Sequence, residues 1–198
     1  MENFTWYPNI AVESSNGVRE MGLYTHNFMS RRVFMIDEIN KVTANNIMMQ
    51  LLYLQDENDK PINLFINSGG GEVGAGLMLY DVITSLKTEI NMYCTGMAAS
   101  MAALLFASGK KGHRFILPHS KTMIHEPLIA GGVGGSASSI HDISESILET
   151  KKICNEILAK HTGKSLEEIN KVTMHDHYMN AEESVKFGMC DGICTVLP

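Results

Sequence analysis

The sequence has too little positive charge for a general binder of nucleic acid. Its 198 residues include 16 lysines and arginines against 22 aspartates and glutamates, which gives a formal net charge of −6. Proteins that bind the phosphate backbone carry an excess of positive charge, so nucleic acid is not expected as a partner. Charged residues make up 19% and hydrophobic residues 44% of the chain, which is typical of a globular protein and argues against intrinsic disorder.

Cysteine pairs and long apolar runs are also scarce. The four cysteines contain no C-x-x-C pair and are too few for a disulfide scaffold in a chain of this length, so we expect mainly buried thiols. The longest apolar run, residues 101–107, is far shorter than the roughly 20 residues of a membrane span. The first residues lack the basic start of a signal peptide. These absences predict a soluble, cytoplasmic protein with no membrane partner.

What the sequence does contain is a regular alternation of strand-like and helix-like segments. Repeated strand–helix–strand units of this length predict an α/β fold with a largely parallel sheet covered by helices. No repeat or linker divides the chain, whose length suits one domain. The predicted strands span residues 33–36, 62–67, 90–94, 114–117 and 122–125, and the predicted helices span residues 43–55, 74–86 and about ten residues from Ser100.

A long helix is predicted over residues 140–160, where Ile140, Ile143, Ile147, Cys154 and Leu158 lie close to one helical stripe. At about 1.5 Å per residue this helix is about 30 Å long. That length is unusual for so small a domain, so we expect the helix to project and to contact a partner subunit.

Other parts of the chain give weaker signals. Residues 1 to about 30 are weakly periodic and predict an arm or loop, with a turn at residues 14–17. A glycine-rich segment, residues 131–136, precedes the long helix. Capping patterns predict short helices after Ser165 and Asn180, the second ending at Gly188.

Three residues could carry nucleophilic chemistry. Ser100 stands among small residues between a predicted strand and a predicted helix, where its hydroxyl would be accessible and the next N–H would face an oxyanion. His125 ends a predicted strand, and Asp176 lies in a polar loop. A hydroxyl nucleophile needs a base, and the base needs an acid to hold its tautomer. The three residues therefore form a candidate Ser–His–Asp set.

Each of these residues also has a purely structural interpretation, which the sequence leaves open. Ser100 would suit a closely packed helix of small residues, His125 a satisfied core histidine, and Asp176 a turn. His175 and His177 are too few ligands for a metal site.

A glycine turn at residues 69–71 follows the clearest predicted strand. It lacks the lysine of a P-loop, so phosphate binding is not favoured. An anion or oxyanion site fits better, although a simple tight turn remains open.

At four motifs the sequence resembles the Clp protease proteolytic subunit, ClpP, and the resemblance covers nearly the whole chain. The motifs are INSGGG at residues 66–71, GMAASMA at 96–102, MIHEP at 123–127 and YMNAEE at 178–183. The resemblance implies a crotonase-like α/β fold in one domain, residues 1–198. Within it, about 1–30 would form an N-terminal arm and axial loop, and about 126–162 the handle region. It also implies a serine endopeptidase without cofactor or metal.

The resemblance assigns roles to individual residues. It implies that Ser100 is the nucleophile, His125 the general base and Asp176 its orienting acid. It also implies an oxyanion hole formed by the backbone N–H groups of Gly71 and Met101.

Gly70 lies next to this implied oxyanion hole.

Family members stack two seven-membered rings face to face through the handle and enclose a chamber. A hexameric AAA+ unfoldase of the ClpX, ClpA or ClpC type feeds unfolded polypeptides into that chamber. The sequence has no P-loop, so the ATPase must be a separate chain.

Further implied features concern docking and substrate. Phe65 and Leu117 match family positions that dock the ATPase, although plain sheet packing also explains them. Residues 8–17 would form the axial pore loop. The glycine-rich segment would act as a strand that pairs with an extended substrate.

Several positions depart from the family pattern. Gly69 replaces a common proline, Glu72 places a charge where a small residue is common, and Met174-His175 replaces an Asp-Arg pair that couples ring contact to the active site. One hypothesis is a paralogous subunit that is weak alone and needs a second ClpP-type partner. The rivals are a non-catalytic ring subunit and a CoA-dependent hydratase or isomerase on the same fold; the intact triad argues against both.

Overall fold

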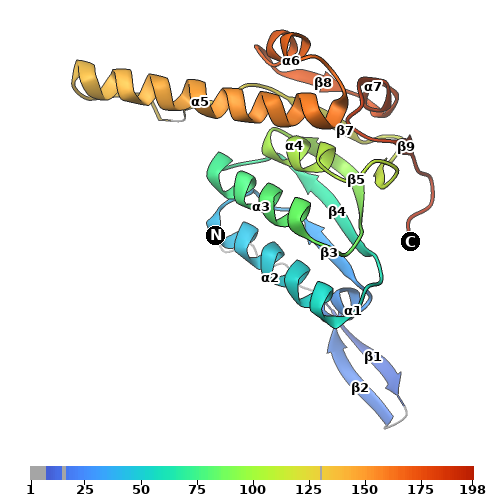
Figure 1. The fold of residues 1–198 in the computed structure, drawn as a ribbon. Coiled ribbons are helices and arrows are strands. Elements are labelled where there is room, and N and C mark those ends of the chain that lie inside the picture. The colour runs from blue at the N-terminus through green and yellow to red at the C-terminus, as the bar shows by residue number, and fades with distance from the viewer. Residues whose placement is uncertain (1–7, 15–16, 130) are drawn as a thin grey trace.

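A mostly parallel sheet forms the body of the molecule in the computed structural model, which describes residues 8–14, 17–129 and 131–198 (Figure 1). In the described chain the strand order is β3-β4-β5-β6-β9, with β7 beside β5 and β8 beside β7. Only β7 and β8 pair antiparallel within this sheet, as described. The predicted α/β fold with a parallel sheet is confirmed. The strands of this sheet are β3 (Arg32–Met35), β4 (Ile62–Ser68), β5 (Ile90–Ala99), β6 (Arg114–Ile116), β7 (Lys121–Ile124), β8 (His177–Met179) and β9 (Gly192–Ile193).

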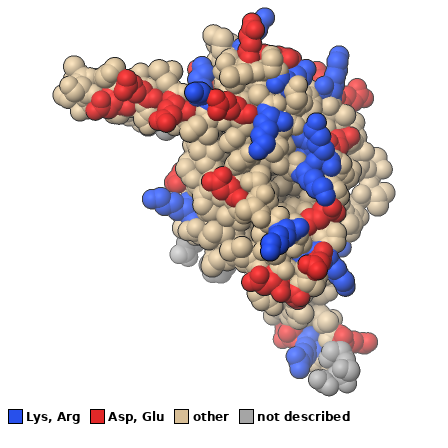
Figure 2. Space-filling model, in the orientation of Figure 1, with Lys and Arg blue, Asp and Glu red and all other residues tan. Residues whose placement is uncertain are grey.

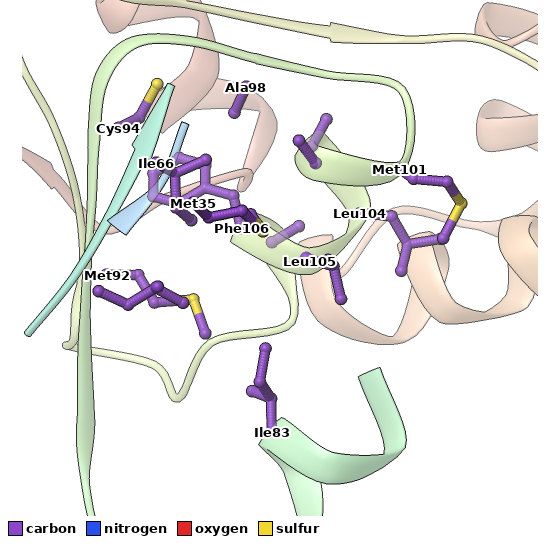
Figure 3. Close-up of a cluster of buried hydrophobic side chains, with 14 of the residues drawn as sticks. Met35, Ile66, Ile83, Met92, Cys94, Ala98, Met101, Leu104, Leu105 and Phe106 are labelled. Carbon is purple, nitrogen blue, oxygen red and sulfur yellow. The ribbon is translucent and has the colours of Figure 1, made fainter. Parts of the chain in front are cut away.

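Helices α2 (Lys41–Glu57), α3 (Val73–Ser85) and α4 (Met101–Ala107) lie side by side over the sheet (Figure 1). Every residue of α4 is buried, whereas α2 buries only one stripe, Ala44, Ile47, Leu51 and Leu54. Figure 3 shows the core that results, a cluster of buried side chains that includes Phe106 of α4 and Met35 and Ile66 of the sheet. This packing fixes α4, and therefore the residue that precedes it, against the centre of the sheet.

The strand β5 is five residues longer than the predicted strand 90–94, because a bulge in its pairing with β4 lets it continue to Ala99. Its pairing with β4 jumps from Ile66↔Cys94 to Ser68↔Ala98. The side chain of Asn67 fills the gap and accepts a hydrogen bond from the Met97 N–H at 3.0 Å. A bulge of this kind re-aims the end of a strand, and here it delivers the chain to Ser100.

The described part of the predicted N-terminal arm is more regular than the sequence indicated. Strands β1 (Asn9–Ser14) and β2 (Gly17–Gly22) form an antiparallel hairpin that extends away from the body, and α1 (Leu23–Met29) follows (Figure 1). The predicted turn at 14–17 falls partly on residues 15–16, and the start of the arm on residues 1–7, which lie outside the described residues.

Helix α5 (Ala137–Thr162) is the predicted long helix, extended by three residues at its N-terminus and two at its C-terminus. With 26 residues it is about 39 Å long at ~1.5 Å per residue. Only Cys154, Asn155 and Leu158 are buried, so the C-terminal half of α5 packs on the body and the N-terminal half projects (Figure 1). In the single chain, the described residues of 127–136 form neither helix nor strand, and those from Leu128 onward are exposed. The expected pairing of this segment with a substrate strand therefore stays a prediction.

The two short C-terminal helices begin at the predicted caps. Ser165 accepts a hydrogen bond from the Glu168 N–H at the start of α6 (Leu166–Val172). Asn180 and Glu183 form a complete capping box on α7 (Ala181–Phe187), which ends at Gly188 in the left-handed conformation. Among the described residues, no helix is both long enough and apolar enough to span a membrane.

His161, in the last turn of α5, should make folding sensitive to acid. Burial, then the neighbouring charges of Lys160 and Arg114, lowers the pKa of His161 to about 4 from 6.5. Its Nε2 lies 3.1 Å from the Tyr80 hydroxyl of α3. The unfolded chain therefore binds more protons than the folded chain between about pH 6.5 and 4, so the free energy of unfolding should fall as the pH is lowered through this window.

Urea unfolding of the wild type and of His161→Gln from pH 7.5 to 4.5 checks this prediction. Glutamine keeps a polar contact to Tyr80 but does not titrate, so its stability should depend less steeply on pH below 6.5. Equal slopes for the two proteins would contradict a role for His161.

Candidate active site

Ser100 occupies the single residue between β5 and α4. Its φ of 54° lies in the left-handed region, which is rare for a residue with a side chain. Strained backbone conformations of this kind occur preferentially at functional sites. Three main-chain bonds hold this conformation: the Ser100 N–H donates to Met123 O at 2.8 Å, and the N–H groups of Ala103 and Leu104 donate to Ser100 O at 3.0 and 3.1 Å. The parallel pairing of β5 with β7 thus sets Ser100 beside the end of β7.

His125 follows β7 directly, and its ring contacts both of the other predicted residues. Its Nε2 lies 2.9 Å from Ser100 Oγ, and its Nδ1 lies 3.1 Å from Asp176 Oδ1. The His125 side chain is 15% exposed and that of Asp176 is 56% exposed. The three residues singled out from the sequence therefore come together in the order Ser–His–Asp, and each distance is within hydrogen-bonding range.

Asp176 reaches His125 because of strand β8, which lies where the sequence pattern predicts a polar loop. Strand β8 pairs antiparallel with β7, with Ile124 opposite His177. In an antiparallel pair the residue after one position lies beside the residue before its partner, so His125 and Asp176 become neighbours. The only advance signal was the short apolar run at residues 178–179.

The glycine turn lies against Ser100 on the other side. A Cβ on Gly70 would lie 2.7 Å from Ser100 Cβ, and a Cβ on Gly71 would collide with the carbonyl oxygen of Ile39. Both glycines have positive φ, 94° and 150°, so glycine is required for conformation and for space. Ser68 stabilises the turn: its Oγ accepts the Gly70 N–H at 3.2 Å and its hydroxyl donates to Asp37 O at 2.6 Å.

The backbone N–H groups of Gly71 and Met101 have no acceptor among the described residues. Each belongs to a residue that lines the same cleft as Ser100. Donors that are free and fixed by a rigid backbone can bind a developing negative charge without further reorganisation. The arrangement is therefore chemically competent to stabilise an oxyanion.

The cleft beside Ser100 and His125 has a volume of about 220 Å³ and a mainly apolar lining. Its floor comes partly from α5, through Cys154 and Leu158. Burial raises the pKa of the Cys154 thiol to about 11, so this sulfur is a neutral part of the wall. The remaining lining residues are Gly69, Gly71, Val73, Met101, Leu104, Met123, Ile124, Pro127 and Leu128.

The other cysteines lie away from this cleft. Cys94 and Cys190 are buried and Cys194 is partly exposed; none of the four forms a disulfide. Burial raises the pKa of Cys94 to about 11 and that of Cys190 to about 12. The expectation of mainly buried, free thiols agrees with these positions.

Phe65 and Leu117, the candidates for ATPase docking, lie elsewhere on the sheet. Phe65 is 6% exposed and stacks between Phe34 and Tyr93, at centroid distances of 5.2 and 5.3 Å. Leu117 is half-buried just after β6. The sequence did not reveal this aromatic row, although the same register position on neighbouring parallel strands carries each ring.

Fold and site together describe a mixed α/β protein in which a serine, a histidine and an aspartate meet beside an apolar cleft. The Clp protease family model matches residues 15–196 of the chain. The chain therefore belongs to the Clp protease family, and this membership implies the ClpP/crotonase fold.

Proposed function

We propose that the protein is a serine endopeptidase subunit of an ATP-dependent protease. The observation that carries the proposal is the continuous contact from Ser100 Oγ to His125 Nε2 at 2.9 Å and from His125 Nδ1 to Asp176 Oδ1 at 3.1 Å. Membership of the Clp protease family supports it. A CoA-dependent hydratase or isomerase on the same fold needs no such set of three side chains.

In the proposed reaction, Ser100 Oγ attacks the carbonyl carbon of a peptide bond while His125 Nε2 takes its proton. The N–H groups of Gly71 and Met101 bind the oxyanion of the tetrahedral intermediate. His125 then protonates the leaving amine, which yields an acyl-enzyme on Ser100. Water, deprotonated by His125, attacks the acyl carbon. The bond from that carbon to Ser100 Oγ then breaks, His125 returns the proton to Oγ, and the product acid leaves. Asp176 holds the His125 tautomer and stabilises the imidazolium throughout.

The proposed substrate is an extended, unfolded polypeptide with an apolar side chain next to the scissile bond. The apolar lining of the cleft supports this choice, since burying such a side chain gives favourable free energy without specific polar contacts. Readout of this kind is weakly selective, so access to the site would have to be controlled by the assembly.

The assembly is proposed by analogy with the family. It comprises stacked heptameric rings joined through α5, axial loops from the β1–β2 hairpin, and a separate AAA+ unfoldase of the ClpX, ClpA or ClpC type that docks near Phe65 and Leu117. The projecting half of α5 carries exposed Ile140, Ile143 and Leu148, which supports a subunit contact there. Figure 2 shows that acidic side chains lie along the exposed surface of α5. We propose that this assembly is cytoplasmic. We also propose that each chain forms one domain, which spans residues 1–198.

The proposal also concerns the peptidase activity of this chain in the absence of a second type of subunit. Met174, which is 57% exposed, and His175 stand where an Asp-Arg pair couples ring contact to the site in the family pattern. We therefore propose weak activity alone and a second ClpP-type subunit as partner. Tetradecamers of the purified chain that cleave short peptides as fast as an ordinary family member would contradict this part.

Fluorophosphonate labelling read by mass spectrometry tests the catalytic proposal. Ser100 should be labelled in the wild type, alone or mixed with a second ClpP-type subunit, and labelling should disappear in Ser100→Ala. Ser139→Ala, which changes an exposed serine on α5, is the matched control and should label like the wild type. Failure to label Ser100 in every assembly condition would favour a non-catalytic docking subunit.

A further inference from the structure

Glu126 is the last residue that attaches the His125 segment to the body. Its N–H donates to Thr173 O at 2.8 Å, three residues before Asp176. The next residue, Pro127, has no N–H to donate. From there to Gly135, the described residues make no main-chain hydrogen bond to the body, and those from Leu128 onward are exposed. Glu126 therefore marks the boundary between the catalytic residues and the exposed glycine-rich segment.

The side chain of Glu126 makes a second attachment, to a different element. Its carboxylate forms an ion pair with Lys151 Nζ, in the middle of α5. Both side chains are half-buried, at 35% and 29% exposure. A shielded pair is screened less by solvent than an exposed one. The neighbouring pair on α5, Lys152–Glu156, is 4.0 Å apart with 72% and 51% exposure.

The two attachments restrain the main chain next to the general base from two directions. One ties it to the segment that carries Asp176, and the other ties it to the helix whose Cys154 and Leu158 form part of the cleft wall. Loss of the ion pair would leave one main-chain bond between His125 and an unattached, glycine-rich segment. Small displacements of the base would then lengthen its contact with Ser100.

We propose that Glu126 is a positioning residue that acts through His125, with Lys151 as its ionic anchor; this inference rests on the proposed peptidase function. Glu126 itself does not line the cleft, whereas His125 directly before it does, so the restraint is proposed to act first on the general base and proton transfer. Misplacing a reacting group by about 1 Å costs up to 10²-fold in rate, so loss of one of two restraints should lower kcat about tenfold and leave KM within about twofold.

The experiment measures kcat and KM on a short fluorogenic peptide, and the rate of fluorophosphonate labelling of Ser100, in the assembly in which the wild type is active. Lys151→Met should show the tenfold loss in kcat and in labelling rate, whereas Lys152→Met, the matched control, should equal the wild type. The charge exchange Glu126→Lys/Lys151→Glu should recover most of the lost kcat, because it restores an ion pair at the same place. Glu126→Gln, which keeps a hydrogen-bond acceptor, should lie between the wild type and Lys151→Met. Melting temperatures of all variants show whether each one folds.

Several outcomes would overturn the inference. Equal kcat for Lys151→Met and Lys152→Met would show that the pair does not position the base. A change confined to KM would assign the pair to binding, and a double exchange no better than Lys151→Met would leave only a packing role. If Lys151→Met does not fold, equal kcat for Glu126→Gln and the wild type would have the same overturning effect. Absence of Ser100 labelling in the wild type would reject the proposed function itself, whereas normal wild-type labelling with an unchanged Lys151→Met rate would reject the positioning role alone.

Discussion

Replacing Asp176 by asparagine is expected to lower kcat about 10⁴-fold while leaving the fold intact. Asparagine has the shape of aspartate, but its amide can donate a hydrogen bond to His125 Nδ1. That bond would favour the tautomer in which Nε2 carries the proton, and a protonated Nε2 cannot accept the proton of Ser100 Oγ. The carboxylate also stabilises the imidazolium that forms during attack, and the amide does not.

Steady-state hydrolysis of a short peptide measures this effect, and thermal unfolding checks the fold. The Asp176 side chain is 56% exposed, so the change should alter the melting temperature little. Asp56→Asn, an exposed acid on α2, is the matched control and should keep wild-type kcat. A loss of less than tenfold for Asp176→Asn would show that another group orients His125.

The order of helices and strands could be predicted from the sequence, because the spacing of apolar residues indicates which face of each segment is buried. The alternation of strands and helices and the long α5 follow from such patterns. The capping box at Asn180 follows equally well, because its two partners are three residues apart in the chain. Each of these features depends on residues that are close in sequence.

The features that assemble the site depend on pairing between distant segments, and for that reason they were harder to predict. Strand β8 has only three residues and gains its identity from β7, more than 50 residues away in the chain. The bulge in β5 depends on the Asn67 side chain from the adjacent strand. The residue types and places of Ser100, His125 and Asp176 suggested a candidate Ser–His–Asp set, and the family resemblance then assigned each residue its role.

The glycine-rich segment depends on a partner that the single chain does not contain. The resemblance implied a strand at residues 131–136, yet the described part of this segment makes no ladder in the single chain. A strand needs a partner for its main-chain groups, and no strand of the described chain lies next to this segment in the sheet. Pairing there would require a substrate or another subunit.

Of the substitutions predicted here, Arg114→Met is expected to lower stability most, by about 3–5 kcal/mol in the free energy of unfolding. Arg114 is 2% exposed and lies at the start of β6. Its guanidinium forms two bonds with Asp191, at 2.6 and 3.0 Å. The same group donates to Ala107 O at 2.8 Å, Gly188 O at 3.2 Å and His161 O at 3.3 Å, which lie at the C-terminal ends of α4, α7 and α5.

One side chain therefore neutralises the negative ends of three helices and a carboxylate. Burial by itself would raise the pKa of Asp191, but its hydrogen bonds and charge interaction with Arg114 together hold that pKa below the usual range. Methionine fills a similar volume without any donor, so these carbonyl oxygens would lose their guanidinium bonds. The Asp191 carboxylate would keep only the backbone N–H groups of Gly112 and residue 114 and would lose its charge partner. Unpaired buried groups of this kind cost more than the pair contributes when intact.

Urea unfolding at neutral pH measures the loss. Lys110→Met, which removes an exposed ion pair with Glu89, is the matched control and should change the free energy of unfolding by less than about 1 kcal/mol. Adding Asp191→Leu to Arg114→Met should recover part of the loss, because it removes the uncompensated carboxylate. If Arg114→Met is no more destabilising than Lys110→Met, the three helix ends must be satisfied by other groups. Some other contact would then have to hold the C-terminal end of α4, the helix that begins directly after Ser100.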